Sequence, residues 1–264
     1  MYTDIEVILH SLSGSVACIV ARMEPDKPRQ LVTLNPDTIF PAASLAKLPI
    51  LVELARQLAE PGCAYTWDTR LAVPAAARVP SDGVLANLSP DLRPTIHDLA
   101  HLMITISDNT ASNVLLDLLG LDAINASMRE LGLQGTRLER RFMDFEARRA
   151  GRDNWTTAAD MALLLAHIHH KRVPERERLL QILLSQNDYH ILPAYWNEEL
   201  LFAHKTGGLT GIMHDAGLLY RTLDDPTPLL IVALTAEQPD IPLTNLNLSR
   251  LGQAIRQEWL QEPA

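Results

Sequence analysis

The apolar positions at the start of the chain change from a helical spacing to a strand-like one. From residue 2 to residue 12 they recur close to the 3.6-residue period of a helix, and Gly14 ends the pattern. Small and β-branched residues then predict a strand over 15–23, and two prolines separate it from a second strand over 30–34. We therefore expect a helix followed by a β-hairpin.

The middle of the chain has the apolar spacing of helices. Thr95 and Asp98 stand at the separation of an N-terminal capping box, which predicts a helix start there. Residues 135–155 are rich in charged side chains without a clear period, and we interpret them as a long structured loop. The other helices are expected over 44–60, 107–119, 122–131 and 156–170.

The last third of the chain returns to strand-like runs. Three of them, separated by turn residues, precede an amphipathic helix: the strands cover 200–205, 215–221 and 228–234, and the helix covers 243–260. Strands at both ends and helices between them predict an α/β (α+β) fold. Residues 1–45 and 195–264 are expected to form one antiparallel sheet flanked by helices, and residues 46–194 an inserted, mostly helical lobe.

Composition and charge narrow the classes of function. Hydrophobic residues make up 47% of the chain and charged residues 21%, which suits a folded protein with a sizeable core. The net charge of −9 argues against nucleic acid as a partner, because phosphate backbones require clustered cations. No stretch is apolar for long enough to span a membrane. The N-terminus lacks the pattern of a signal peptide, so we expect a cytoplasmic protein, or a periplasmic or secreted one if a signal has been removed.

Cysteines and histidines do not indicate a metal site. Cys18 and Cys63 are too few for a disulfide framework or a four-ligand zinc site, and we expect two buried free thiols. His167, His169 and His170 fall in the last turn of an expected helix, where cations complement the helix dipole. We expect no metal and no cofactor.

The first candidate for chemistry is the S-x-x-K sequence formed by Ser44 and Lys47. A spacing of three residues places both side chains on one face of a helix. A partly desolvated lysine can accept the proton of a serine hydroxyl and make it a nucleophile. The alternative is an N-cap serine followed by a solvated lysine.

Two further motifs follow downstream. Ser107, Asp108 and Asn109 form an S-D-N sequence that alone would be interpreted as a helix cap. Residues 205–208 read K-T-G-G at the end of a strand-like run, and alone they would be a strand followed by a glycine turn. In this order, S-x-x-K, S-D-N and K-T-G are the signature of class A β-lactamases and penicillin-binding proteins. The chain resembles this serine hydrolase family from end to end.

The resemblance implies an acyl-transfer site between the two lobes. Ser44 would be the acylated nucleophile and Lys47 its proton acceptor, and Ser107 would relay a proton to the leaving nitrogen. The backbone N–H groups of Ser44 and Gly208 would form the oxyanion hole. Lys205 would lie in the same site, where two lysines close together lower the pKa of one of them.

The resemblance also implies a substrate-binding set. Asn109 would hold the amide side chain of the substrate and Lys47. Lys205 and Thr206 would bind the substrate carboxylate and tune Ser107, and Gly207 would also belong to the substrate-binding set. Many class A enzymes place an arginine on the next strand, but residues 212–215 contain none, so His214 is the candidate there. The expected partner is a small β-lactam or peptide-like molecule with a carboxylate, and the expected oligomeric state is a monomer.

The chain departs from the family at the residue that activates the deacylating water. With Arg140 as the anchor, the position of the usual glutamate falls on Phe142, which cannot accept a proton. Asp144 and Glu146 are the candidate replacements, or they pair with nearby arginines. We expect a class A β-lactamase-like hydrolase; the alternatives are a penicillin-binding D,D-peptidase or esterase with slow deacylation, and a non-catalytic ligand-binding or sensor domain.

Overall fold

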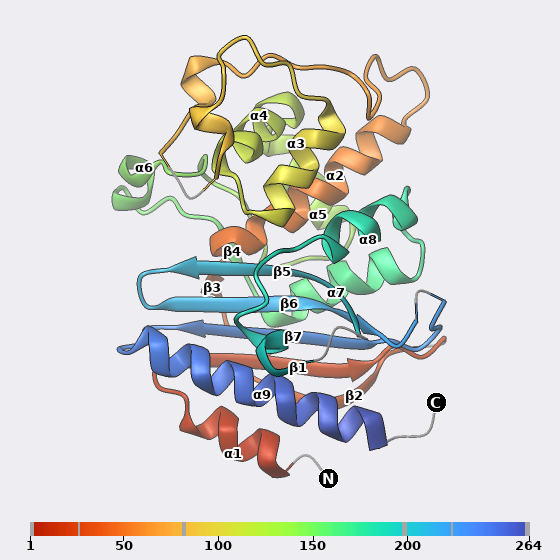
Figure 1. Cartoon of the computed structure of the whole chain (residues 1–264), viewed down its shortest axis with the longest axis vertical. Coiled ribbons are helices and arrows are strands. Elements are labelled where there is room, and N and C mark those ends of the chain that lie inside the picture. Colours follow the sequence, from red (N-terminus) through yellow and green to blue (C-terminus); the bar gives the residue numbers. More distant parts are fainter. Residues whose placement is uncertain (1–2, 26, 81–82, 197–199, 223, 262–264) are drawn as a thin grey trace.

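A five-stranded antiparallel sheet joins the two ends of the chain. The computed structural model describes residues 3–25, 27–80, 83–196, 200–222 and 224–261. The strand order is β2-β1-β7-β6-β5, with β5 at the edge nearest the helical part (Figure 1). The strands are β1 (Ser15–Arg22), β2 (Arg29–Leu34), β5 (Leu201–Leu209), β6 (Ile212–Tyr220) and β7 (Leu229–Ala236). The pairing of β1 with β7 confirms that both termini build one sheet.

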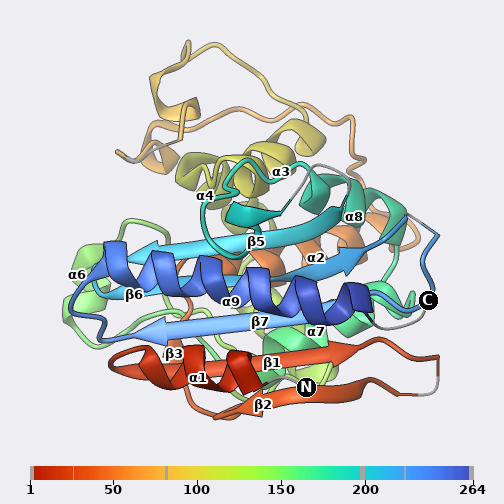
Figure 2. The same ribbon diagram turned by 60° about the horizontal axis from the view of Figure 1, so that its bottom comes forward.

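Two helices cover one face of this sheet. Helix α1 (Thr3–Ser11) lies over β1 and β2, and α9 (Ile241–Gln261) lies beside it and runs along β6 and β7 (Figure 2). Both helices have an apolar stripe that the sheet removes from water, which is the main source of their stability. The buried side chains between helices and sheet include Ile5, Leu9, Val20, Ile231, Leu251 and Trp259.

The opposite face and one edge of the sheet carry the remaining helices. They are α2 (Lys47–Ala59), α3 (Ile96–Thr105), α4 (Asn109–Leu119), α5 (Leu121–Glu130), α6 (Phe145–Arg149), α7 (Ala158–His169) and α8 (Arg176–Leu184). Short 3₁₀ turns lie at η1 (Ala43–Ala46), η2 (Ala75–Ala77), η3 (Leu85–Asn87) and η4 (Leu192–Tyr195), and β3 (Phe40–Pro41) pairs with β4 (Trp155–Thr156).

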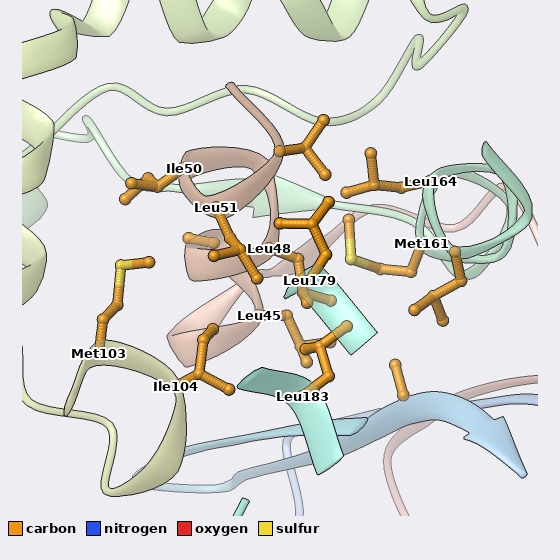
Figure 3. Close-up of a cluster of buried hydrophobic side chains, with 14 of the residues drawn as sticks. Leu45, Leu48, Ile50, Leu51, Met103, Ile104, Met161, Leu164, Leu179 and Leu183 are labelled. Carbon is orange, nitrogen blue, oxygen red and sulfur yellow. The ribbon is translucent and has the colours of Figure 1, made fainter. Parts of the chain in front are cut away.

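An apolar cluster holds four of these helices against the turn η1. Leu45 and Leu48, from η1 and the first turn of α2, point into it and have no exposed surface (Figure 3). Side chains of α3, α7 and α8 surround them, including Met103, Ile104, Met161, Leu164, Leu179 and Leu183. Because interiors of this kind are close-packed, the backbone of η1 and of the α2 start is fixed in place.

Most predicted elements are confirmed, and the differences have local causes. The capping box at Thr95 and Asp98 is present, with both reciprocal hydrogen bonds. The helix expected from residue 44 begins with a 3₁₀ turn, and the helix expected from Ser107 begins at Asn109, because Ser107 adopts a left-handed backbone with φ of 57°. Helix α8 was not predicted, and the expected loop over 135–155 contains α6 and β4.

The expectations for the cysteines, for a membrane span and for a metal site can be compared with the described residues. Cys18 and Cys63 are free thiols, but only Cys18 is buried and Cys63 is half-buried. Within the described ranges, no helix is both long and apolar enough to cross a bilayer. Over the same ranges, no group of three or more histidine, cysteine or acidic side chains is arranged to hold a metal ion.

Gly252 is required where α9 crosses η4. A Cβ there would lie 2.7 Å from the carbonyl carbon of Leu192, and Trp196 donates a hydrogen bond to the Gly252 carbonyl at 2.9 Å. Exchanging glycine for alanine inside a helix normally stabilises it by about 1 kcal/mol. Here we expect Gly252→Ala to lower the free energy of unfolding by about 2 kcal/mol, because the added Cβ would force the backbone at Leu192 to move. Urea denaturation measures the change, and Gln253→Ala on the exposed side is the control, expected within about 0.5 kcal/mol of the wild type.

Candidate active site

Ser44 lies on η1, where the edge strand β5 meets the start of α2. The preceding residue, Ala43, has a left-handed backbone with φ of 47°. Gly207 on β5 approaches so closely that a Cβ there would lie 3.2 Å from the backbone nitrogen of Ser44 and 3.3 Å from the Cβ of Ala43. Glycine at this position therefore allows strand and turn to touch without displacing the serine.

The side chain of Lys47 connects three separate segments of the chain. Its Nζ lies 3.1 Å from Ser44 Oγ and 2.7 Å from Ser107 Oγ. It also donates to the carbonyl oxygen of Ser107 at 2.7 Å and to Oδ1 of Asn109 at 2.8 Å. The two serine hydroxyls are themselves 2.8 Å apart. S-x-x-K and S-D-N thus form one continuous hydrogen-bonded group.

The surroundings of Lys47 favour its neutral form. Its side chain has no exposed surface, and burial lowers its pKa well below 10.5, with a further decrease from the charge of Lys205 and an opposing effect of Asp108. The Ser107 carbonyl and Asn109 Oδ1 can only accept hydrogen bonds. The lowered pKa raises the share of neutral amine, whose single lone pair can accept the proton of one neighbouring hydroxyl.

Asp108 fixes the S-D-N segment from behind. Its Oδ1 accepts a hydrogen bond from the N–H of Ala111 as the N-cap of α4, and its Oδ2 accepts one from the N–H of Leu85 at 2.8 Å. The left-handed backbone of Ser107 then directs both its hydroxyl and its carbonyl toward Lys47. Unusual backbone conformations of this kind persist only where surrounding contacts hold them.

Strand β5 supplies the K-T-G side of the site. Lys205 has no exposed surface, and its Nζ donates to the carbonyl oxygen of Thr206 at 3.0 Å. Burial lowers its pKa from 10.5 to about 8, although the charges of Asp188 and Asp215 act in the opposite direction. Gly208 is exposed, and no atom lies within 4 Å of the position its Cβ would take. The strand therefore presents an open backbone edge beside Ser44.

A pocket of about 860 Å³ opens over these residues. Of the residues predicted for the site, it is lined by Ser44, Ser107, Asn109, Thr206 and Gly208. Lys47 and Lys205 lie buried behind this lining, and Gly207 packs against η1. The structure thus brings the three motifs together at one place.

The loop before α6 places an aromatic ring in this pocket. Asn113 of α4 holds the backbone of Phe142 by two hydrogen bonds, from its Nδ2 to the carbonyl at 3.2 Å and from the N–H to its Oδ1 at 2.9 Å. The ring lines the pocket, and Lys47 Nζ lies 4.9 Å from its centroid. A buried ion pair between Arg140 and Asp153, at 2.7 Å, holds the base of the loop.

Two candidate carboxylates do not join this group. Asp144 is half-buried and serves as the N-cap of α6, where its Oδ1 accepts a hydrogen bond from the N–H of Ala147 at 2.9 Å. Glu146, in the first turn of α6, is exposed. Neither residue lines the pocket. The extra helix turn in this loop, which the sequence pattern did not indicate, turns both carboxylates away.

His214 is also not brought into the pocket. It has no exposed surface, its Nε2 donates to the carbonyl oxygen of Pro41 at 2.9 Å, and its Nδ1 accepts from the N–H of Thr235 at 3.1 Å. Burial lowers its pKa to about 4, which keeps the ring neutral. Because both ring nitrogens are hydrogen-bonded, His214 joins β3 to the sheet and has no ring N–H left to donate to a substrate carboxylate.

Two parts of the site were hardly indicated by the sequence pattern. Asn113 stands four residues after Asn109, so both lie on one face of α4, and that spacing was the available signal. The segment after α8 contributes Gln186, Asn187, Asp188 and His190 to the pocket. These residues follow a helix that was not predicted, and only the fold places them opposite Ser107.

Comparison with known proteins agrees with this geometry. Residues 2–259 match the family described as the beta-lactamase enzyme family. A β-lactamase of Streptomyces fradiae is 29% identical over 85% of this chain and 76% of its own length. The crystal structure of a β-lactamase from Sphaerobacter thermophilus has a TM-score of 0.85 and 27% identity, and covers all of both chains. PBP-A has a TM-score of 0.85 and 25% identity over 98% of this chain and 95% of that one, and a variant of it is described as an acyl-enzyme complex with penicillin G. The chain belongs to the β-lactamase enzyme family and is a class A-like serine hydrolase.

Proposed function

We propose that this hydrolase is acylated on Ser44 by β-lactams and releases the acyl group slowly. The observation that carries the proposal is the contact of Ser44 Oγ with both Lys47 Nζ, at 3.1 Å, and Ser107 Oγ, at 2.8 Å. A hydroxyl between a neutral amine and a second hydroxyl can lose its proton as it attacks and pass it onward.

The acylation step uses the residues of all three motifs. Ser44 Oγ bonds to the lactam carbonyl carbon while its proton moves to Lys47 Nζ. The lactam C–N bond then breaks, and a proton passes through the Ser107 hydroxyl to the ring nitrogen. The N–H groups of Ser44 and Gly208 would stabilise the negative charge on the carbonyl oxygen. Asn109 and Thr206, which line the pocket, would hold the amide side chain and the carboxylate.

Slow deacylation follows from Phe142. Hydrolysis of the ester requires a base that activates water. Phe142 lines the pocket at the sequence position where the glutamate that serves as this base is expected. Asp144 caps a helix and Glu146 is exposed, so neither replaces it. Losing a positioned general base slows a step by about 10²–10⁴. The geometry therefore favours a penicillin-binding enzyme over an efficient β-lactamase.

Replacing the nucleophile tests acylation. Wild-type protein incubated with penicillin G should gain the mass of one penicillin, and Ser44→Ala should gain none, because it lacks the attacking oxygen. Intact-mass spectrometry measures the adduct. Ser11→Ala, an exposed serine on α1, is the control and should behave like the wild type. An adduct of equal yield on Ser44→Ala would reject the assignment.

Restoring a carboxylate tests the deacylation step. Phe142→Glu should raise the rate of loss of the penicillin adduct by about 10²-fold, since it supplies a base beside the ester. Phe142→Gln is the matched control, because it has the same length and polarity without a basic oxygen. The decay of the adduct mass after removal of free penicillin gives both rates. Equal rates for the two variants would contradict the role given to Phe142.

The pKa of Lys205 predicts how the acylation rate constant depends on pH in the alkaline range. Its ammonium attracts a substrate carboxylate only below its pKa of about 8, so that attraction is lost as the pH rises through this value. We expect the acylation rate constant with penicillin G to fall above pH 8. The methyl ester of penicillin G, which lacks the charge, should show no such decrease. Identical profiles for acid and ester would show that Lys205 does not bind the carboxylate.

A further inference from the structure

The segment over 186–190 forms part of the pocket wall, to which Gln186, Asn187, Asp188 and His190 contribute. Gln186 is buried, and its Nε2 donates to the carbonyl oxygen of Ile104 at 3.0 Å while its Oε1 accepts from the N–H of Asp188 at 3.1 Å. The N–H of Asn187 donates to the carbonyl oxygen of Thr105 at 3.1 Å. These bonds hold the segment against the end of α3.

The same segment also packs on the strand that carries Lys205. The ring of Tyr189 lies 5.9 Å from that of His204, the residue before Lys205 on β5. Asp188 Oδ1 accepts a hydrogen bond from the N–H of His190 at 3.3 Å, which fixes the direction of the side chain. Asp188 is therefore held in the pocket wall at its Lys205 end, and its charge raises the pKa of Lys205.

Asp188 is the only carboxylate among the described residues that line the pocket. The arginines among those same residues are Arg140 and Arg148, and both pair with Asp153, at 2.7 Å and 3.1 Å. At the Lys205 end, His214 is neutral and fully hydrogen-bonded. The charge of Asp188, which lines the pocket, thus partly offsets the positive charge of Lys205 before any substrate arrives.

We propose that Asp188 sets the charge specificity of the site by weakening the attraction of Lys205 for a substrate carboxylate, so that substrates with an uncharged ester or amide at this place are accepted as well as those with a carboxylate. This inference rests on the proposed acylation of Ser44 and adds the substrate class. A substrate carboxylate beside Lys205 would approach the like charge of Asp188, whose backbone N–H is held by Gln186 and whose Oδ1 accepts from the N–H of His190. Like charges brought together across a partly desolvated site oppose binding, and this is a common means of rejecting a ligand.

Two penicillins that differ only in charge provide the test. The acylation rate constant is measured at pH 6.5 with penicillin G and with its methyl ester, and the acid-to-ester ratio is compared among variants. Asp188→Asn should raise this ratio about tenfold, because it removes the repulsion while its amide oxygen still accepts from the N–H of His190. Asp122→Asn, which removes an exposed charge on α5, should leave the ratio unchanged.

The pH profile gives a second readout with the opposite sign. Lys205 is faced by Asp188 from the segment after α8, by Asp215 from β6 and by Lys47 from α2, and histidines at 190 and 204 adjoin the two carboxylates. Removing Asp188 removes a charge that raises the pKa of Lys205. The alkaline limb with penicillin G should therefore move to lower pH in Asp188→Asn, so the gain seen at pH 6.5 shrinks or reverses above pH 8.

The outcomes separate the inference from the function on which it rests. The charge specificity is supported if Asp188→Asn, but not Asp122→Asn, raises the acid-to-ester ratio and moves the alkaline decrease of the acylation rate constant to lower pH. An unchanged ratio in a variant that is still acylated on Ser44 overturns it and leaves the proposed function intact. If neither penicillin acylates the wild-type protein, the proposed function fails and the inference fails with it. Circular dichroism of each variant checks that the fold is retained.

Discussion

The site depends on satisfying one buried amine. Lys47 has no exposed surface, so its Nζ must find partners inside the protein, and it finds them on Ser44, Ser107 and Asn109. An unpaired polar group at this depth would be strongly destabilising. The requirement ties the start of α2 to the start of α4, and the same burial that needs these partners lowers the pKa of the amine. Structure and reactivity therefore have one cause.

The rest of the fold keeps that arrangement rigid. Leu45 and Leu48 anchor the serine-bearing turn in the apolar cluster on one side, and Gly207 lets β5 press against it on the other. Left-handed backbones at Ala43 and Ser107 place the two hydroxyls, and they are maintained because the neighbouring residues are packed and hydrogen-bonded. A close-packed surround of this kind supplies the fixed geometry that acyl transfer requires.

Two residues that line the pocket, Phe142 and Asp188, carry the proposals made for this chain. Phe142, held by Asn113, brings an apolar ring to the place where a water-activating carboxylate is expected. Asp188, held by Gln186, brings a negative charge to the end where a substrate carboxylate is expected. The first concerns the fate of the acyl-enzyme and the second concerns which substrates form it.

Local patterns in the sequence determined much of this protein. The strand and helix periodicities, the capping box at Thr95 and the three motifs around Ser44, Ser107 and Lys205 depend on residues near one another in the chain. They predicted most of the elements and the α/β fold, and they indicated the candidate site. The tertiary structure alone decided that Asp144 caps α6, that His214 bonds to β3 and the sheet, and that Asp188 lines the pocket. These outcomes depend on contacts between segments distant in sequence, whose hydrogen bonds and burial exist only once the chain has packed.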